Sequence, residues 1–250
     1  MLRHLKIAIF VLVISVIVSC NDDDPKPFKQ TVNLIITHKW KDSALKLNKE
    51  NYWDRSFRID TISVNNIIYH INNLRLKTTD SLIVDAHSQY YMVDLLQNKT
   101  FPQDIAFETP LEGVKYYICS IEFTIGIEDS ITNLKNTLST LFPNPMYSDS
   151  IKGYINFNFE GYSNKINSIK YKVGGYVNPY KNSRRIKLTL NKPFLLNRYN
   201  TLSLKADIFK LFKSKNQIDI ETLNYVEKPD NDSKKLAENI ATIFSVESFK

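Results

Sequence analysis

The sequence predicts an all-β protein, an antiparallel β-sandwich of about 9–11 strands with one short C-terminal helix. Two long runs, 114–127 and 151–160, alternate between two faces, as a strand at the surface of a sheet does. In the second run, Ile155, Phe157 and Phe159 share one face. Near the C-terminus the apolar spacing changes to that of a helix, so we expect helical structure to be a minor part of the chain.

Short runs rich in β-branched and aromatic residues recur along the chain, and Asn, Asp, Pro and Gly separate them. Many such runs at close spacing are typical of a sandwich. The expected strands are 31–38, 44–47, 57–64, 67–76, 82–84, 90–95, 114–127, 151–160, 169–173, 185–190 and 201–208.

Two segments have the apolar spacing of a helix. The first, 130–138, is short, and Asp129 or Ser130 would cap it. The second, 233–244, is longer and follows a polar turn at 229–232 that supplies a cap. Its apolar stripe consists of Leu236, Ile240 and Ile243, with Ala237 and Phe244 beside them. We therefore expect the C-terminal helix over 233–244.

The first twenty residues have the pattern of an export signal. Arg3 and Lys6 precede an apolar run over 7–18, and a small residue and Cys20 close it. About a dozen apolar residues are too few to span a hydrocarbon core, which needs about 20. The ending Ile-Val-Ser-Cys resembles a bacterial lipobox, so we expect 1–19 to be a lipoprotein signal peptide and Cys20 to carry lipid. The alternative is an uncleaved membrane anchor.

The residues after Cys20 form an acidic stretch that cannot bury apolar surface. We expect 20–30 to be a flexible tether and 31–250 to be the folded domain. An aspartate directly after the lipidated cysteine would resemble an inner-membrane retention signal, but Asn21 stands there. The sequence thus favours an outer-membrane lipoprotein, on the periplasmic face or at the cell surface, held to the membrane through Cys20.

The charge of the chain is basic but dispersed. The full sequence has 33 Lys and Arg against 26 Asp and Glu. Removal of Arg3 and Lys6 with the signal leaves 31 against 26, a net charge of +5. The cations form no long block, which argues against a nucleic-acid partner. Once Cys20 is lipidated, Cys119 is a lone cysteine in an apolar run, and we expect a small buried hydrophobic residue.

Several segments, taken in order, resemble the MbnP-like family of small exported β-proteins associated with copper and methanobactin gene clusters. The resemblance covers roughly 31–247 and is most specific at 152–161 (KGYINFNFEG). The other matching segments are His38 with 45–47, 67–76 (IIYHINNLRL), 91–94 (YMVD), 121–127 (IEFTIGI), Met146-Tyr147, 171–174, 206–209 and 239–244. The resemblance implies a β-sandwich, copper as the bound metal, and a haem-peroxidase-type partner.

The chain departs from the family in its metal ligands. Copper-binding relatives use histidine nitrogens and an oxidised tryptophan, kynurenine. The tryptophan pair that precedes the Gly-Tyr strand in the family would fall near 146–150, where this chain has none. That ligand cannot be carried over.

Imidazole is a ligand that copper prefers, so the histidines are the first candidates. The mature chain has His38, His70 and His87. We expect any metal site to be open and mostly histidine, using His38 with Met146 or with a second histidine that the fold brings close. The structural alternatives are a half-exposed His38 beside Trp40, a space-filling His70 and a solvated His87 in a loop.

No sequence motif of a hydrolase, a thiol redox enzyme, a zinc peptidase or a phosphate-binding loop is present, so we expect a protein that is not an enzyme. Two functions remain open. The first is a lipid-anchored binding protein that handles copper or another metal. The second is a cell-surface structural or adhesion module whose ligand is a protein or a glycan, for which Tyr176, Tyr180 and Tyr199 could form an aromatic platform.

Overall fold

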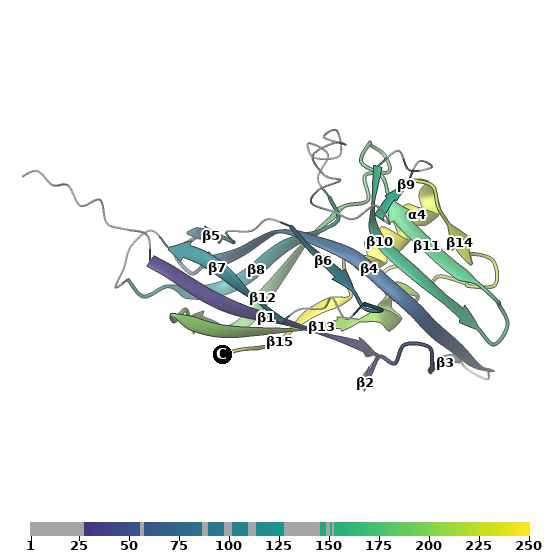
Figure 1. The fold of residues 1–250 in the computed structure, drawn as a ribbon, viewed down its shortest axis with the longest axis horizontal. Coiled ribbons are helices and arrows are strands. Elements are labelled where there is room, and N and C mark those ends of the chain that lie inside the picture. Colours follow the sequence, from purple (N-terminus) through teal and green to yellow (C-terminus); the bar gives the residue numbers. More distant parts are fainter. Residues whose placement is uncertain are drawn as a thin grey trace, which may run out of the picture.

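The structure is a computed structural model that describes residues 28–55, 58–86, 90–97, 102–109, 114–127, 146–148, 151 and 153–250. The predicted signal peptide, the predicted lipidation site Cys20 and the expected helix at 130–138 lie outside these residues, and so does His87. Within the described part, two β-sheets form a sandwich, which confirms the predicted fold class (Figure 1). No helix among these residues has the length and apolar character needed to cross a membrane.

The smaller sheet is built around β1 (Phe28–Trp40). β1 pairs in parallel with β13 (Tyr199–Asp207) and, on its other edge, antiparallel with β7 (Pro102–Thr109). β15 (Phe244–Phe249) lies outside β13, and β2 (Ser43–Ala44) pairs with the end of β1. β1 begins three residues earlier than expected, so 28–30 belong to the sandwich and not to the tether. The β1–β13 pair is parallel, whereas the other pairs of this sheet are antiparallel, as the sequence predicts.

The larger sheet is built around β4 (Arg58–Thr78), a strand of 21 residues. It joins the expected strands 57–64 and 67–76 into one. Its remaining strands are β3 (Glu50–Arg55), β5 (Ile83–Asp85), β6 (Tyr90–Asp94), β8 (Tyr117–Ile125), β9 (Tyr147–Ser148), β10 (Gly153–Ser163), β11 (Ile169–Gly174), β12 (Arg184–Leu195) and β14 (Tyr225–Val226). With short segments such as β9 and β14 included, the described part has more β segments than the 9–11 expected.

One edge of β4 changes its partner partway along the strand. Ile71 pairs with both β6 and β8, so these two strands lie on opposite edges of β4. Tyr69 pairs with both β6 and β10, so these also lie on opposite edges. β8 and β10 therefore follow one another along the same edge of β4, and the change falls at His70.

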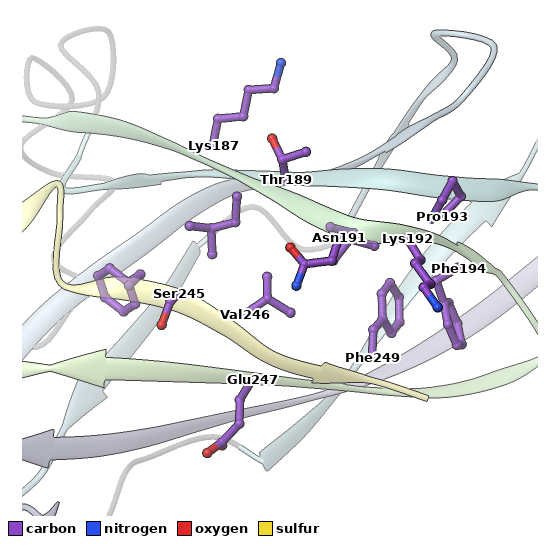
Figure 2. A pocket seen from close by; sticks show the side chains of 13 residues that line it. Lys187, Thr189, Asn191, Lys192, Pro193, Phe194, Ser245, Val246, Glu247 and Phe249 are labelled. Atoms are coloured by element: carbon purple, nitrogen blue, oxygen red, sulfur yellow. The ribbon is translucent and has the colours of Figure 1, made fainter. Parts of the chain in front are cut away.

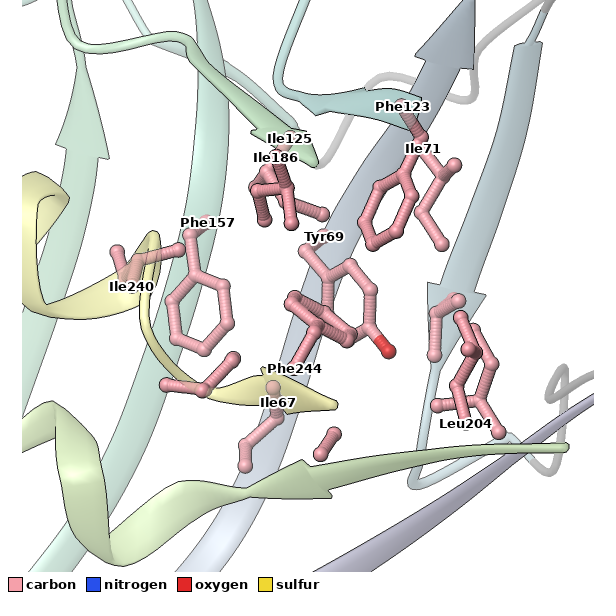
Figure 3. Close-up of a cluster of buried hydrophobic side chains, with 14 of the residues drawn as sticks. Ile67, Tyr69, Ile71, Phe123, Ile125, Phe157, Ile186, Leu204, Ile240 and Phe244 are labelled. Atoms are coloured by element: carbon pink, nitrogen blue, oxygen red, sulfur yellow. The ribbon is translucent and has the colours of Figure 1, made fainter. Parts of the chain in front are cut away.

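The main core fills the space between the two sheets. Alternate residues of β4 point into it, and among them Tyr69 is fully buried. The Tyr69 ring stacks on Phe157 of β10 with 5.6 Å between centroids, and Phe244 of β15 meets the same ring edge-on at 5.8 Å (Figure 3). These aromatic contacts join β4 and β10 of the larger sheet to β15 of the smaller sheet.

The helix α4 (Asn231–Ile240) covers one end of the sandwich beside the 3-10 turn η2 (Ile208–Leu211). Asp230 caps α4: its side chain accepts a hydrogen bond from the backbone N–H of Ser233, and the Ser233 hydroxyl oxygen accepts one from the backbone N–H of Asp230. The C-terminal helix is thus confirmed, but it ends at Ile240. The expectation that it extends to residue 244 is wrong, because Phe244 opens β15.

Candidate functional site

His70 lies at the point where the edge of β4 changes partner, on the face opposite the main core. Its neighbours Tyr69 and Ile71 point into the core, so the alternation of the strand turns His70 to the other face with Ile68. The side chain is fully buried there. The sequence predicts a space-filling histidine here, which agrees with its burial. It does not predict which side chains surround the ring.

Burial controls the protonation of His70. Desolvation lowers the pKa of its imidazole from 6.5 to about 4, and a hydrogen bond to the backbone of Ile155 opposes that shift. The ring is therefore neutral at pH 7, which is the state in which an imidazole binds a metal. In metal sites, a histidine commonly donates one ring N–H to a backbone carbonyl, which fixes its tautomer and the orientation of the other nitrogen.

Two methionines lie on the same side of the sheet as His70. Met92 of β6 is the direct cross-strand partner of His70, and directly opposed residues of an antiparallel pair have Cβ atoms about 4.5–5.5 Å apart. Met146 is fully buried among apolar side chains. We call this group the outer cluster: Ile68, His70, Met92, Ile127, Met146, Ile151, Tyr154 and Ile155, with Tyr90 and Tyr147 packed beside them.

A tight turn after β8 closes one side of the outer cluster. Gly126 has a φ of +107°, and its N–H donates to the backbone carbonyl of His70 at 2.9 Å. The side-chain amide of Asn72 donates to the carbonyl of Gly126 at 2.7 Å, and Asn156 Oδ1 accepts from the N–H of Ile127 at 3.1 Å. A Cβ atom at Gly126 would meet the side chain of Asn156 at 2.4 Å. The backbone around His70 is therefore fixed by hydrogen bonds and close packing.

His38 occupies a different place from the outer cluster. Its Nε2 lies 2.9 Å from the hydroxyl of Tyr69, whose ring belongs to the main core. Burial lowers the pKa of His38 to about 4. The neighbouring Trp40 is buried, and its indole N–H donates to the backbone carbonyl of Tyr52 at 2.8 Å. His38 is thus a polar contact between the two sheets.

The structure separates His38 from the other predicted ligands that it describes. His38 meets Tyr69 in the main core, whereas Met146 and His70 lie on the opposite face of β4. The expected pairing of His38 with Met146 or with His70 is therefore not formed. Of the predicted metal residues that the structure describes, His70 and Met146 lie on the same face of the larger sheet. The sequence did not suggest Met92, although its place in the alternating run YYMVD gave it a defined face.

Cys119 on β8 is only half-buried, in contrast to the expectation of a buried position. Its thiol lies 3.3 Å from the backbone carbonyl of Thr78, to which it donates. It lies near the start of β8, whereas Gly126, which closes one side of the outer cluster, follows the end of that strand.

A groove of about 530 Å³ lies between the edge strands β12 and β15 (Figure 2). Strand edges can accept an added strand, but β12 carries Lys192 and Pro193 and pairs irregularly with β8 between Thr189 and Phe194. Edge lysines, prolines and irregularities are devices that prevent strand addition. The Phe194 and Phe249 rings also stack at 4.1 Å, which joins the two edges at one end of the groove. We therefore interpret this groove as the place where the two sheets meet at their edges, and not as a site that binds an extended peptide.

The outer cluster has the donor chemistry of a soft metal site. Among the described residues, no group of three or more His, Cys, Asp and Glu side chains is placed to hold a metal ion. The cluster differs because two of its donors are thioethers. Thioether ligands select soft ions such as Cu(I), and imidazole also suits copper.

The comparisons with known proteins agree with the fold. The family model described as MbnP matches residues 29–231. Among solved structures, MbnP from Methylosinus trichosporium is similar, with a TM-score of 0.50 and 12% sequence identity, over 76% of this chain and 80% of that chain. A likeness at this identity bears on the fold alone. No curated protein sequence matches the chain.

Proposed function

The chain belongs to the MbnP family, and we propose that it is a lipid-anchored, extracytoplasmic binding protein that holds a soft metal ion at the outer cluster. Copper(I) is the ion that these donors suit best. A haem-peroxidase-type partner, as the family resemblance implies, belongs to the same proposal. The function is one of binding and not of catalysis.

The observation that carries the metal proposal is the grouping of one buried imidazole with two thioethers. His70 is neutral because burial lowers its pKa, so a metal would not have to displace a proton from it at pH 7. Met92 faces it from β6, and Met146 packs in the same cluster. Met146 also opens the segment where relatives carry the tryptophan pair. In this chain a thioether would serve where relatives use an oxidised tryptophan.

The replacement of both methionines by leucine tests this site. Leucine keeps nearly the volume of methionine but cannot ligate a metal, so the fold should survive. We expect Met92→Leu/Met146→Leu to weaken Cu(I) affinity at least about tenfold, about 1.4 kcal/mol, in a titration against a competing Cu(I) chelator. His38→Gln is the matched control, since His38 contacts Tyr69 of the main core and not the outer cluster, and it should bind as the unchanged protein does. Equal affinity in the double variant and the unchanged protein would remove the outer cluster from the proposal.

Lipidation is tested separately. We expect Cys20→Ser to release the protein from the membrane fraction of cells, because the variant cannot accept a thioether-linked lipid. Cys119→Ser, which leaves the lipobox intact, should remain with the membranes. If the Cys20→Ser protein still sediments with membranes, the lipobox assignment is wrong.

A second candidate function is a surface module that binds a protein or a glycan. A small hollow of about 280 Å³ is lined by Tyr176, Val177, Asn178 and Tyr180 together with Ile151, Gly175 and Pro229. Tyrosine rings beside an amide side chain are suited to the apolar faces and hydroxyl groups of a sugar. Loss of glycan binding in Tyr176→Ala/Tyr180→Ala, with unchanged Cu(I) affinity, would favour this function over the first.

A further inference from the structure

One end of the sandwich is defined by the start of β1, and several other strand ends meet it there. Thr31 of β1 pairs with Tyr199 at the start of β13. Tyr117 at the start of β8 pairs with Leu195 at the end of β12, and its carbonyl accepts from the N–H of Thr79 just after β4. Figure 1 shows the start of β1 at the same end as β5, β7 and β8. We call this the anchor-side end, because the tether to Cys20 joins the domain here.

Large apolar side chains are exposed at the anchor-side end. Tyr199 is 72% exposed, and Ile83, Val114 and Tyr117 are between 44% and 48% exposed. Ile83 is the cross-strand partner of Lys77 near the end of β4, which places it with the others. Exposed tyrosines with an apolar ring and a polar tip are typical of side chains that sit at the headgroup level of a membrane.

The same end is rich in cations. Its described residues include the cations Lys29, Arg75, Lys77, Lys115, Lys192 and Arg198 and the carboxylates Asp80, Asp85 and Glu108, of which Asp85 pairs with Arg75 at 2.6 Å. Glu108 is the cross-strand partner of Lys29, and Asp80 accepts a hydrogen bond from the hydroxyl of Thr78. The guanidinium of Arg198 lies 5.6 Å from the centroid of the Tyr199 ring. The surplus of positive charge is next to the exposed rings.

The tether is too short to hold this end far from a membrane. Phe28 is the eighth residue after Cys20, so even a fully extended chain separates them by no more than about 29 Å. The opposite end of the domain, with β3 and the start of β4, is one long strand farther away. A lipid on Cys20 would therefore bring the exposed rings and the cations within reach of the headgroups.

We propose that the anchor-side end of the sandwich is a membrane-docking surface, which lies against anionic lipid headgroups. The tyrosines enter the headgroup layer, and the lysines and Arg198 contact lipid phosphates. Docking fixes the domain with its long axis away from the membrane. The orientation in cells rests on the proposed lipid at Cys20, but the surface itself can be measured without it.

The test uses the mature chain with Cys20→Ser, so that no lipid is attached. Binding is measured by sedimentation with vesicles made of equal parts phosphatidylcholine and phosphatidylglycerol, and with vesicles of phosphatidylcholine alone. We expect binding to the anionic vesicles only, and weaker binding as salt is added. Each basic residue near an anionic surface contributes about fivefold in affinity, so Lys115→Glu/Lys192→Glu/Arg198→Glu should reduce binding on the order of a hundredfold.

A matched variant at the opposite end separates docking from general charge attraction. Lys46, Lys49 and Lys228 are exposed and lie away from the anchor-side end. Their replacement by glutamate changes the net charge equally but should leave binding nearly unchanged. In the same way, Tyr117→Ser/Tyr199→Ser should weaken binding, while Tyr52→Ser/Tyr162→Ser should not.

Three outcomes would overturn the proposal: no binding of the starting protein to anionic vesicles, equal losses in the two charge variants, or equal losses in the two tyrosine variants. Circular dichroism of each variant shows whether it is folded. Because every protein in this test lacks Cys20, the result does not depend on lipidation, and failure of the docking surface is distinct from failure of the anchor.

Discussion

Replacing Phe157 with alanine will lower the free energy of unfolding by about 3–5 kcal/mol, the usual cost of removing a buried phenylalanine ring. Phe157 is fully buried, stacks on Tyr69 and lies among the side chains that join the two sheets (Figure 3). Its neighbours are held by β4 and β10, so they cannot collapse into the cavity without distorting the pairing of Phe157 with Tyr69. A urea titration at pH 7 measures the loss.

Tyr162→Ala is the matched control for Phe157→Ala. Tyr162 lies on the same strand but is 42% exposed, so its loss should cost about 1 kcal/mol or less. A loss of similar size in the two variants would mean that β10 contributes through its backbone pairing and not through the main core.

Much of the larger sheet could be predicted from the sequence, because β8 and β10 have strict alternation and long apolar runs. The single strand β4 could not. The polar residues Asn65 and Asn66 suggest a break between two strands. In the structure, the side chain of Asn66 accepts hydrogen bonds from the N–H groups of Ile67 and Leu96, and β10 shifts register opposite this point. Asn66 thus stabilises an irregularity within one continuous strand. This irregularity depends on Leu96 and β10, which are distant in the sequence.

The end of the C-terminal helix shows the same limit. Ile243 and Phe244 continue the helical spacing of Leu236 and Ile240, and all four are buried. Phe244 is buried, however, because it pairs with Ala206 of β13 and meets Phe123 edge-on at 5.2 Å. The spacing of buried apolar residues is therefore the same for a longer helix and for a helix followed by a strand. The pairing of residues 244–249 with β13, which the local sequence does not show, makes this segment a strand.

For the candidate site, the sequence identified His70 and Met146 as residues worth testing but not their relation. The grouping depends on which face of β4 each residue occupies and on β6 as its neighbour. Residue 69 points into the main core, and residue 70 points into the outer cluster. A shift of one residue in the expected register would therefore place His70 in the main core and Tyr69 in the outer cluster. Met92 enters the site only through its pairing with His70.

The last expected result is a loss of stability in mild acid. Burial lowers the pKa of both His38 and His70 from 6.5 to about 4, so the folded state keeps both rings neutral while the unfolded state takes up protons below about pH 6.5. The stabilisation is therefore complete above pH 6.5, is lost as the pH falls from 6.5 to 4, and changes no further below that. Between pH 7 and pH 5 we expect a loss of about 2 kcal/mol for each histidine, or about 4 kcal/mol together.

Urea titrations at pH 7, 6 and 5 measure this slope above the range in which ordinary carboxylates titrate. In His38→Gln/His70→Gln the difference between pH 7 and pH 5 should nearly disappear, whatever the stability of the variant at pH 7. Each single variant should keep about half of it, because the rings lie on opposite faces of β4 and titrate independently. An unchanged slope in the double variant would show that the two rings are hydrated in solution. Because His70 is already neutral in the folded state over this range, bound Cu(I) should raise the free energy of unfolding of the unchanged protein about equally at pH 7 and pH 5, and should stabilise Met92→Leu/Met146→Leu less.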